Sequence, residues 1–157
     1  MPRRKRVLPK RVYADPRYNS TVIGKFINSI MKQGKKSTAL TVFYDALEII
    51  HKRTGEDGYQ VFDKALNNVK PIVEVRSRRI GGANYQVPME VKPERKLALA
   101  IRWMLDATRA RNDHSTAEKL ASEVIAAYKK ENSAALKKRD DTHRMAEANK
   151  AYAHFRF

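Results

Sequence analysis

The sequence offers few residues that could carry out a reaction. Its four histidines, His51, His114, His143 and His154, lie far apart along the chain. None belongs to a His-Glu-x-x-His pair that could hold zinc, and no Gly-x-Ser-x-Gly stretch could present a nucleophile. The chain has no cysteine, which excludes thiol catalysis, disulfides and cysteine-ligated metals. We therefore predict a protein that is not an enzyme and has no metal or cofactor, and we interpret each histidine as a helix-surface or RNA-facing residue.

The excess of positive charge indicates the kind of partner that this protein binds. Lys and Arg number 33 against 17 Asp and Glu, giving a formal net charge of +16 and a pI near 10.2. Such an excess causes self-repulsion and is typical of proteins with a polyanionic partner. Because the basic residues recur along the whole chain and not on a single amphipathic helix, the pattern favours nucleic acid over an anionic membrane. No apolar run approaches the roughly 18 residues of a membrane span, and the basic start lacks the apolar segment of a secretory signal.

One basic motif alternates its apolar residues as a strand does, in contrast to the rest of the chain. It reads VEVRSRRIGGANYQVPMEV at residues 73–91 and predicts a β-hairpin around a glycine pair. We expect the register that gathers the apolar side chains on one face and leaves the three-residue loop 81–83. The facing residues in that register are Val73 with Val91, Val75 with Met89, Ser77 with Val87, and Arg79 with Tyr85.

This hairpin could present arginines to nucleic acid. Arg78 and Arg79 carry planar guanidinium groups that match phosphate geometry, and Tyr85 offers a ring face for stacking on a base. A two-stranded ribbon is marginal alone in water, so its base must rest on helices while its tip projects. The alternative is that the glycine pair is only a turn and the arginines form a solvated face. The motif is not a phosphate-binding P-loop, since the Gly-Lys-Ser/Thr part is missing.

Helical periodicity dominates the remaining sequence. Residues 1–19, with three prolines and six positive charges before the first acid, are expected to form a basic arm. The fold class predicted for residues 20–157 is mainly α, with about six helices in one bundle-like domain and the ribbon protruding between the third and fourth. The expected helix signals are a cap at Asn19 or Ser20 with a stop at Gly34, a second helix at 37–53, a third at 57–69, Pro93 opening the fourth, a capping box at Ser115 for the fifth, and Asp140 or Asp141 capping the sixth.

Further basic residues cluster on these predicted helices. Lys32, Lys35 and Lys36 surround the Gly34 turn, and Arg95, Arg102 and Arg109 share one helix face because steps of seven residues return to it. The C-terminal segment interleaves basic residues with Tyr152 and Phe155, which could bind RNA or equally pin the last helix to the core. For the basic face of the fourth helix, a solvated helix face remains the alternative.

Two long blocks resemble a known family. EVRSRRIGGANYQVPMEV at 74–91 and RMAEANKAYAHFRF at 144–157 closely resemble the bacterial-type small-subunit ribosomal protein seven family, and so does FINSIMKQGKK at 26–36. The resemblance implies primary binding to the 3′ major domain of 16S ribosomal RNA, where it nucleates assembly of the subunit head. It also implies a ribbon near the exit-site transfer RNA and the messenger exit path at the subunit interface. The implied partner proteins are small-subunit ribosomal proteins nine and eleven. The resemblance also implies that the chain does not act as a homo-oligomer and that it belongs to a cytoplasmic or organellar ribosome.

The basic pattern and the resemblance together give two sets of candidate site residues. Those at the tip of the ribbon, near transfer and messenger RNA, are Arg78, Arg79, Gly81, Gly82, Ala83, Asn84 and Tyr85. The candidate ribosomal RNA contacts are Arg3, Arg4, Lys5, Arg6, Lys10, Arg11, Lys32, Lys35, Lys36, Arg76, Arg78, Arg79, Arg95, Lys96, Arg102, Arg109, Arg144 and Lys150. Two rival interpretations are a free nucleic-acid-binding regulator, for which we find no clear dimer seam, and an enzyme acting on nucleic acid, for which we find no carboxylate cluster.

Overall fold

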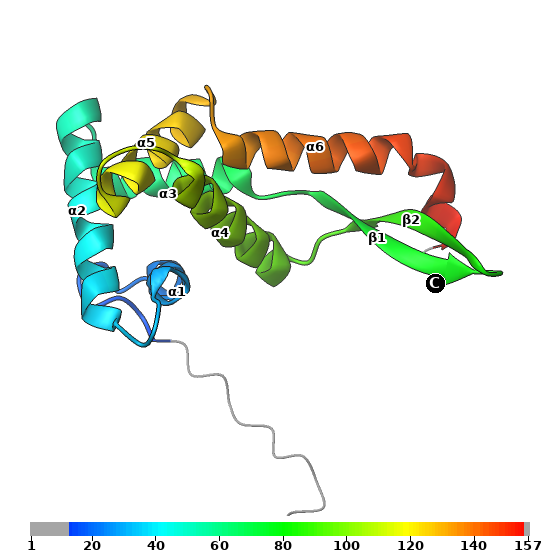
Figure 1. Ribbon diagram of the computed structural model, residues 1–157, viewed down its shortest axis with the longest axis horizontal. Coiled ribbons are helices and arrows are strands. Elements are labelled where there is room, and N and C mark those ends of the chain that lie inside the picture. Colours follow the sequence, from blue (N-terminus) through cyan, green and yellow to red (C-terminus); the bar gives the residue numbers. More distant parts are fainter. Residues whose placement is uncertain (1–12, 156–157) are drawn as a thin grey trace, which may run out of the picture. The chain divides into compact units, whose positions relative to one another are not determined.

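A computed structural model describes residues 13–155 of the chain (Figure 1). The candidate contacts Arg3, Arg4, Lys5, Arg6, Lys10 and Arg11 of the predicted arm lie outside the described residues. The chain divides into two compact units, Met1–Leu40 and Thr41–Phe157.

The described part is mostly helical and contains one two-stranded antiparallel sheet. This confirms the predicted fold class, including the position of the ribbon between the third and fourth helices. The elements in chain order are α1 Thr21–Ile30, α2 Lys36–Thr54, α3 Gly58–Val69, β1 Val73–Ile80, β2 Ala83–Glu90, α4 Pro93–Ala110, α5 Thr116–Lys129, α6 Ala134–Ala148 and the 3-10 helix η1 Lys150–Phe155.

In the first unit, a tight turn precedes α1. The buried Asp15 accepts hydrogen bonds at Oδ2 from the backbone N–H groups of Arg17 and Tyr18, at 3.1 and 3.0 Å. Gly24 is required on α1, because a Cβ there would lie 2.2 Å from the carbonyl oxygen of Tyr13. The helix buries three apolar side chains, those of Ile23, Phe26 and Ile27.

In the second unit, the core lies among the helices that surround α3. Helix α3 contacts α4, α5 and α6, and α4 also contacts α5. The rings of Phe43 and Phe62 meet edge to face with centroids 5.2 Å apart, and both side chains are almost fully buried. Several helix starts are those expected from sequence: Asp57 caps α3, Pro93 opens α4, and Ser115 and Glu118 form the capping box of α5.

The start of the sixth helix was predicted wrongly. Its N-cap is Ser133, not Asp140 or Asp141, and the basic run 137–139 lies inside the helix. The Ser133 hydroxyl accepts from the N–H of Leu136 at 3.2 Å and donates to the carboxylate of Glu123 at 2.7 Å. Glu123 is 1% exposed, accepts from the N–H of Ala135 at 3.1 Å and is paired with Arg111 at 2.7 Å. The helix therefore begins at Ser133, a preferred N-cap residue that the local sequence did offer, and the buried carboxylate of Glu123 from α5 holds the Ser133 hydroxyl in place.

The predicted ribbon register was also wrong, by one residue. Arg76 faces Val87 and Arg78 faces Tyr85, so the loop contains only Gly81 and Gly82. Both glycines have positive φ, 57° and 90°, the conformation that a two-residue type I′ hairpin turn requires. Glycine adopts this backbone without a steric penalty, and the two-residue turn sets the pairing of the strands. The side-chain pattern that favoured the longer loop is overruled.

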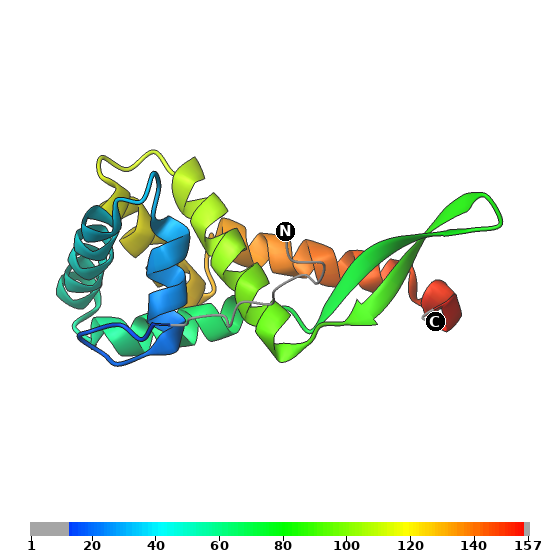
Figure 2. The same ribbon diagram turned by 90° about the horizontal axis from the view of Figure 1, so that it is seen from below.

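The ribbon extends past the helices of the second unit, with α6 running beside it (Figures 1 and 2). Helix α6 contacts both strands, and η1 contacts β2. At the base of the ribbon, Val87 and Pro88 are buried. The ribbon therefore has a supported base and a tip that is open to a partner.

Candidate nucleic-acid interface

The tip of the ribbon is an exposed, basic surface. Residues 79–84 are all exposed, and Arg78 is half-buried. Within residues 13–155, the side chains of Arg78 and Arg79 form no hydrogen bond or ion pair, so both guanidinium groups can receive an external anion. The structure thus brings the predicted tip residues together on one projecting turn.

Tyr85 has partners that the sequence did not predict. Its ring centroid lies 5.3 Å from that of Tyr152 and 5.4 Å from that of Phe155, both in η1. Tyr152 and Phe155 therefore hold the C-terminal turn against the ribbon, whereas the sequence had offered RNA or the core as their partners. Tyr85 is half-buried by this packing, and its stacking on a base stays a prediction.

The base of the ribbon contains a carboxylate between two arginines. Glu74 on β1 is buried, with 9% of its side chain exposed. The Nε atom of Arg76 donates to Glu74 Oε1 at 2.9 Å. The Nε atom of Arg95, on α4, donates to the same oxygen at 2.8 Å and to Oε2 at 2.7 Å. A lone acid in an arginine-rich strand was the only signal for this cluster in the sequence.

Helix α4 presents the predicted basic face. Arg95, Arg102 and Arg109 are all exposed, at the spacing of seven residues expected for one side, while Lys96 is half-buried. Arg109 lies 3.7 Å from Asp106 in an exposed pair, which contributes little to stability. The opposite side of α4 is buried in the core through residues such as Met104.

The remaining candidates lie on exposed segments of the two units. Lys32, Lys35 and Lys36 are exposed around Gly34 in the first unit, where Lys36 Nζ lies 5.8 Å from the ring centroid of Tyr13. In the second unit Arg144 and Lys150 are exposed, and Arg144 is 3.7 Å from Asp141.

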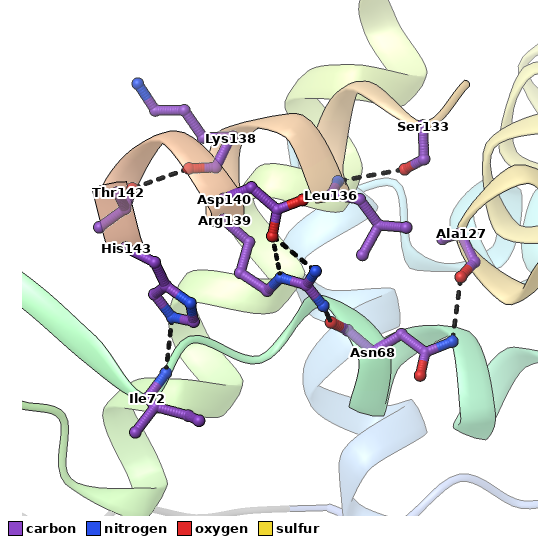
Figure 3. Close-up of polar contacts among 10 residues, drawn as sticks. All are labelled: Asn68, Ile72, Ala127, Ser133, Leu136, Lys138, Arg139, Asp140, Thr142 and His143. Carbon is purple, nitrogen blue, oxygen red and sulfur yellow. Dashed lines mark hydrogen bonds and ion pairs between the residues drawn. The ribbon is translucent and has the colours of Figure 1, made fainter. Parts of the chain in front are cut away.

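A polar cluster ties α6 to the segment that leads into the ribbon (Figure 3). Arg139 donates to the carbonyl of Asn68 and pairs with Asp140 at 2.6 Å. His143 Nε2 accepts a hydrogen bond from the N–H of Ile72 at 3.0 Å. Burial, followed by the neighbouring Arg139 guanidinium, lowers the pKa of His143 below its ordinary value, and Asp140 opposes that shift. His143 therefore has a structural contact that its interpretation as a surface residue missed.

The described residues 13–155 assemble no group of three or more His, Asp or Glu side chains that could hold a metal ion. In the same range no helix has the length and apolar character needed to cross a membrane.

The helical body, the projecting ribbon and the unpaired arginines define a class of basic, nucleic-acid-associated proteins. A comparison with family models gives the particular family: the model described as ribosomal protein S7p/S5e matches residues 2–150. The chain belongs to this family.

Curated relatives agree over the full length of the chain. The small ribosomal subunit protein uS7 of Gemmatimonas aurantiaca is 55% identical over 157 residues, which is 100% of both proteins. That of Cytophaga hutchinsonii is 55% identical, over 95% of this chain and 97% of the relative. That of Lactobacillus delbrueckii subsp. bulgaricus is 53% identical over 100% of both. The resemblance stated from the sequence is confirmed: the chain is a structural, non-enzymatic protein of the small ribosomal subunit, associated with its RNA.

Proposed function

We propose that this chain is a primary binder of the 3′ major domain of 16S ribosomal RNA and nucleates assembly of the head of a cytoplasmic small subunit. The observation that carries the proposal is the exposed arginine set on β1 and α4, within a chain of net charge +16. Lys and Arg neutralise RNA phosphates and release counterions, while the packed helices fix the relative positions of those charges. The RNA is read mainly through its shape, backbone and 2′-hydroxyl groups.

The ribbon has a separate role in this proposal. Its tip, residues 78–85, reaches the exit-site transfer RNA and the messenger exit path at the subunit interface. The supporting feature is a basic, exposed turn that projects from a base packed on α6 and joined to α4 by the Glu74–Arg95 ion pair. The protein acts as a single copy, beside small-subunit ribosomal proteins nine and eleven.

Salt dependence tests whether phosphates lead the binding. If about eight phosphates are neutralised, a log–log plot of the binding constant against salt concentration has a slope of roughly −6, between the single-strand and duplex coefficients. The measurement is a filter-binding or calorimetric titration of the purified protein with the 3′ major domain fragment. A nearly flat plot would contradict the proposal. Sedimentation of the protein apart from small subunits would instead favour a free regulator.

A pair of double variants tests the division between ribbon and body. Arg78→Ala with Arg79→Ala removes two charges at the tip, and Lys137→Ala with Lys138→Ala removes two exposed charges on α6 as the matched control. We expect the tip variant to weaken transfer RNA binding to the exit site of reconstituted subunits several-fold more than it weakens binding to the ribosomal RNA fragment. Complete loss of fragment binding by the tip variant, with circular dichroism unchanged, would show that this division is wrong.

A further inference from the structure

Glu74 occupies an unusual position for an acid in an RNA-binding ribbon. It is buried at the base of the ribbon, and it accepts from one arginine of β1 and one of α4. A buried carboxylate requires such donors, because its desolvation is otherwise costly. Both arginines use only Nε in these contacts. Within the described range, the terminal nitrogens of Arg76 and Arg95 form no hydrogen bond or ion pair.

The geometry leaves two guanidinium edges side by side. Both Nε atoms lie within 2.9 Å of Glu74 Oε1, so the two planar groups are neighbours although they come from different elements. Their side chains remain 50% and 47% exposed. A guanidinium bound through Nε still has its Nη atoms available, and these match the spacing of phosphate oxygens.

The charges of the cluster also do not cancel. Two arginines and one carboxylate leave a net charge of about +1 at the base of the ribbon. One phosphodiester, with a single negative charge and free oxygens, would balance it. A metal cation would be repelled by this net positive charge. An anion would also have to present accessible oxygens to the arginine Nη atoms.

We propose that Glu74 is a positioning residue, which holds Arg76 and Arg95 as one clamp for a single RNA phosphate. This inference rests on the proposed function, since the phosphate belongs to the bound RNA. It extends that function by assigning a role to an acidic residue, and by joining two of the candidate contacts into one site. The clamp also fixes the orientation of β1 against α4, so the phosphate is bound where the ribbon leaves the helical body.

The charge of Glu74 gives the proposal a distinctive test. Glu74→Gln removes a negative charge, which by simple electrostatics should tighten RNA binding. Positioning predicts the reverse, because glutamine keeps only one, uncharged acceptor oxygen for the two arginines, and its NH₂ group would meet the Nε–H of Arg95 as a second donor in place of Oε2. We expect binding of the ribosomal RNA fragment to weaken roughly tenfold, the equivalent of one charge-assisted hydrogen bond.

Glu90→Gln is the matched control. Glu90 lies on β2 at the same end of the ribbon and faces Val73, and it is exposed without an ion pair among residues 13–155. Its replacement removes the same charge and should leave binding unchanged or slightly tighter. Equal effects of the two substitutions would overturn the proposal.

Arginine variants test the shared phosphate without altering the buried acid. If one phosphate serves both arginines, Arg76→Ala and Arg95→Ala each leave the salt slope nearly unchanged, and the double variant lowers its magnitude by about 0.7–0.9. Two independent phosphates would lower it by that amount in each single variant. Arg95→Lys keeps the charge but its one ammonium group pairs with Glu74, so we expect it to bind as weakly as Arg95→Ala. Binding equal to that of the unaltered protein would contradict the clamp.

A background experiment separates positioning from a purely structural role. In the Arg76→Ala, Arg95→Ala background, Glu74→Gln should weaken RNA binding no further, since no clamp remains to orient. An equal loss in both backgrounds would show that Glu74 only maintains the fold. Failure of the proposed function is distinguishable, because then the unaltered protein itself lacks steep, salt-dependent binding to the fragment. If that binding is present and Glu74→Gln behaves like Glu90→Gln, only the clamp is refuted.

Discussion

The helices around α3 and the ribbon of strands β1 and β2 are held by different forces. Phe62, Met104 and Leu120 on three helices are almost fully buried, so apolar burial stabilises this part. The ribbon buries little at its tip. Its base is fixed by packing on α6, with Val87 and Pro88 buried, and by the ion pairs of Glu74; farther out, β2 is held by ring contacts with η1.

This difference separates stability from binding. A tip that contributes little to the core can expose arginines and glycines without reducing the stability of the helices. The cost is that the outer part of the ribbon is fixed mainly by the ring contacts of Tyr85 with η1, which are partly open to solvent. The comparison implies that a substitution in one region should leave the other nearly unaffected.

The largest expected effect comes from the core. Phe62→Ala removes a ring that is 1% exposed and packed edge to face on Phe43. We expect the free energy of unfolding to fall by about 3–5 kcal/mol, from lost burial and the cavity left behind. Denaturant unfolding followed by circular dichroism measures it. Ile80→Ala at the tip, where the side chain is 36% exposed, should change that free energy by no more than about 0.5 kcal/mol. If Ile80→Ala lowered the free energy of unfolding as much as Phe62→Ala, the tip would contribute to stability as the core does, and the proposed difference would be wrong.

An intermediate effect is expected where the C-terminal turn meets the ribbon. Tyr152→Ala removes the ring contact with Tyr85 and should cost about 0.5–1.5 kcal/mol locally. Hydrogen exchange of the β2 amides should accelerate, while that of α3 amides stays unchanged. Met145→Ala, an exposed apolar side chain on α6, is the control and should alter neither. Faster exchange throughout α3 would show that ribbon and core unfold as one unit.

The sequence predicted features whose causes are local. The capping box of Ser115 and Glu118, Pro93 at the start of α4 and the hairpin around the glycine pair all depend on residues close together in the chain. The errors arose where local signals competed. Ser133 and the two aspartates Asp140 and Asp141 are all N-cap residue types, and the structure uses Ser133 for α6. The register depended on whether turn geometry or side-chain pairing prevails.

The candidate site shows the same limit. Arginines at the tip could be chosen by charge and by the glycine turn, and the family resemblance added the kind of RNA. The burial of Glu74 could not be predicted, because it depends on Arg95, which is distant in sequence and lies on another element. Similarly, the partners of Tyr85 come from η1 at the other end of the unit's sequence.

The smallest expected effect is pH-dependent and concerns the segment that joins the two regions. His143 Nε2 must be unprotonated to accept from the N–H of Ile72, and the pKa of His143 in the folded protein lies below 6.5. Between that lowered pKa and 6.5 the unfolded chain binds more protons than the folded one, so stability falls as pH falls. The contribution is complete above pH 6.5 and is lost as pH decreases through the folded-state pKa. His143→Gln keeps an acceptor for Ile72 but cannot titrate, so its denaturation midpoint should depend less on pH than that of the unaltered protein. Identical pH profiles of the two proteins would show that this histidine does not couple protonation to the attachment of the ribbon.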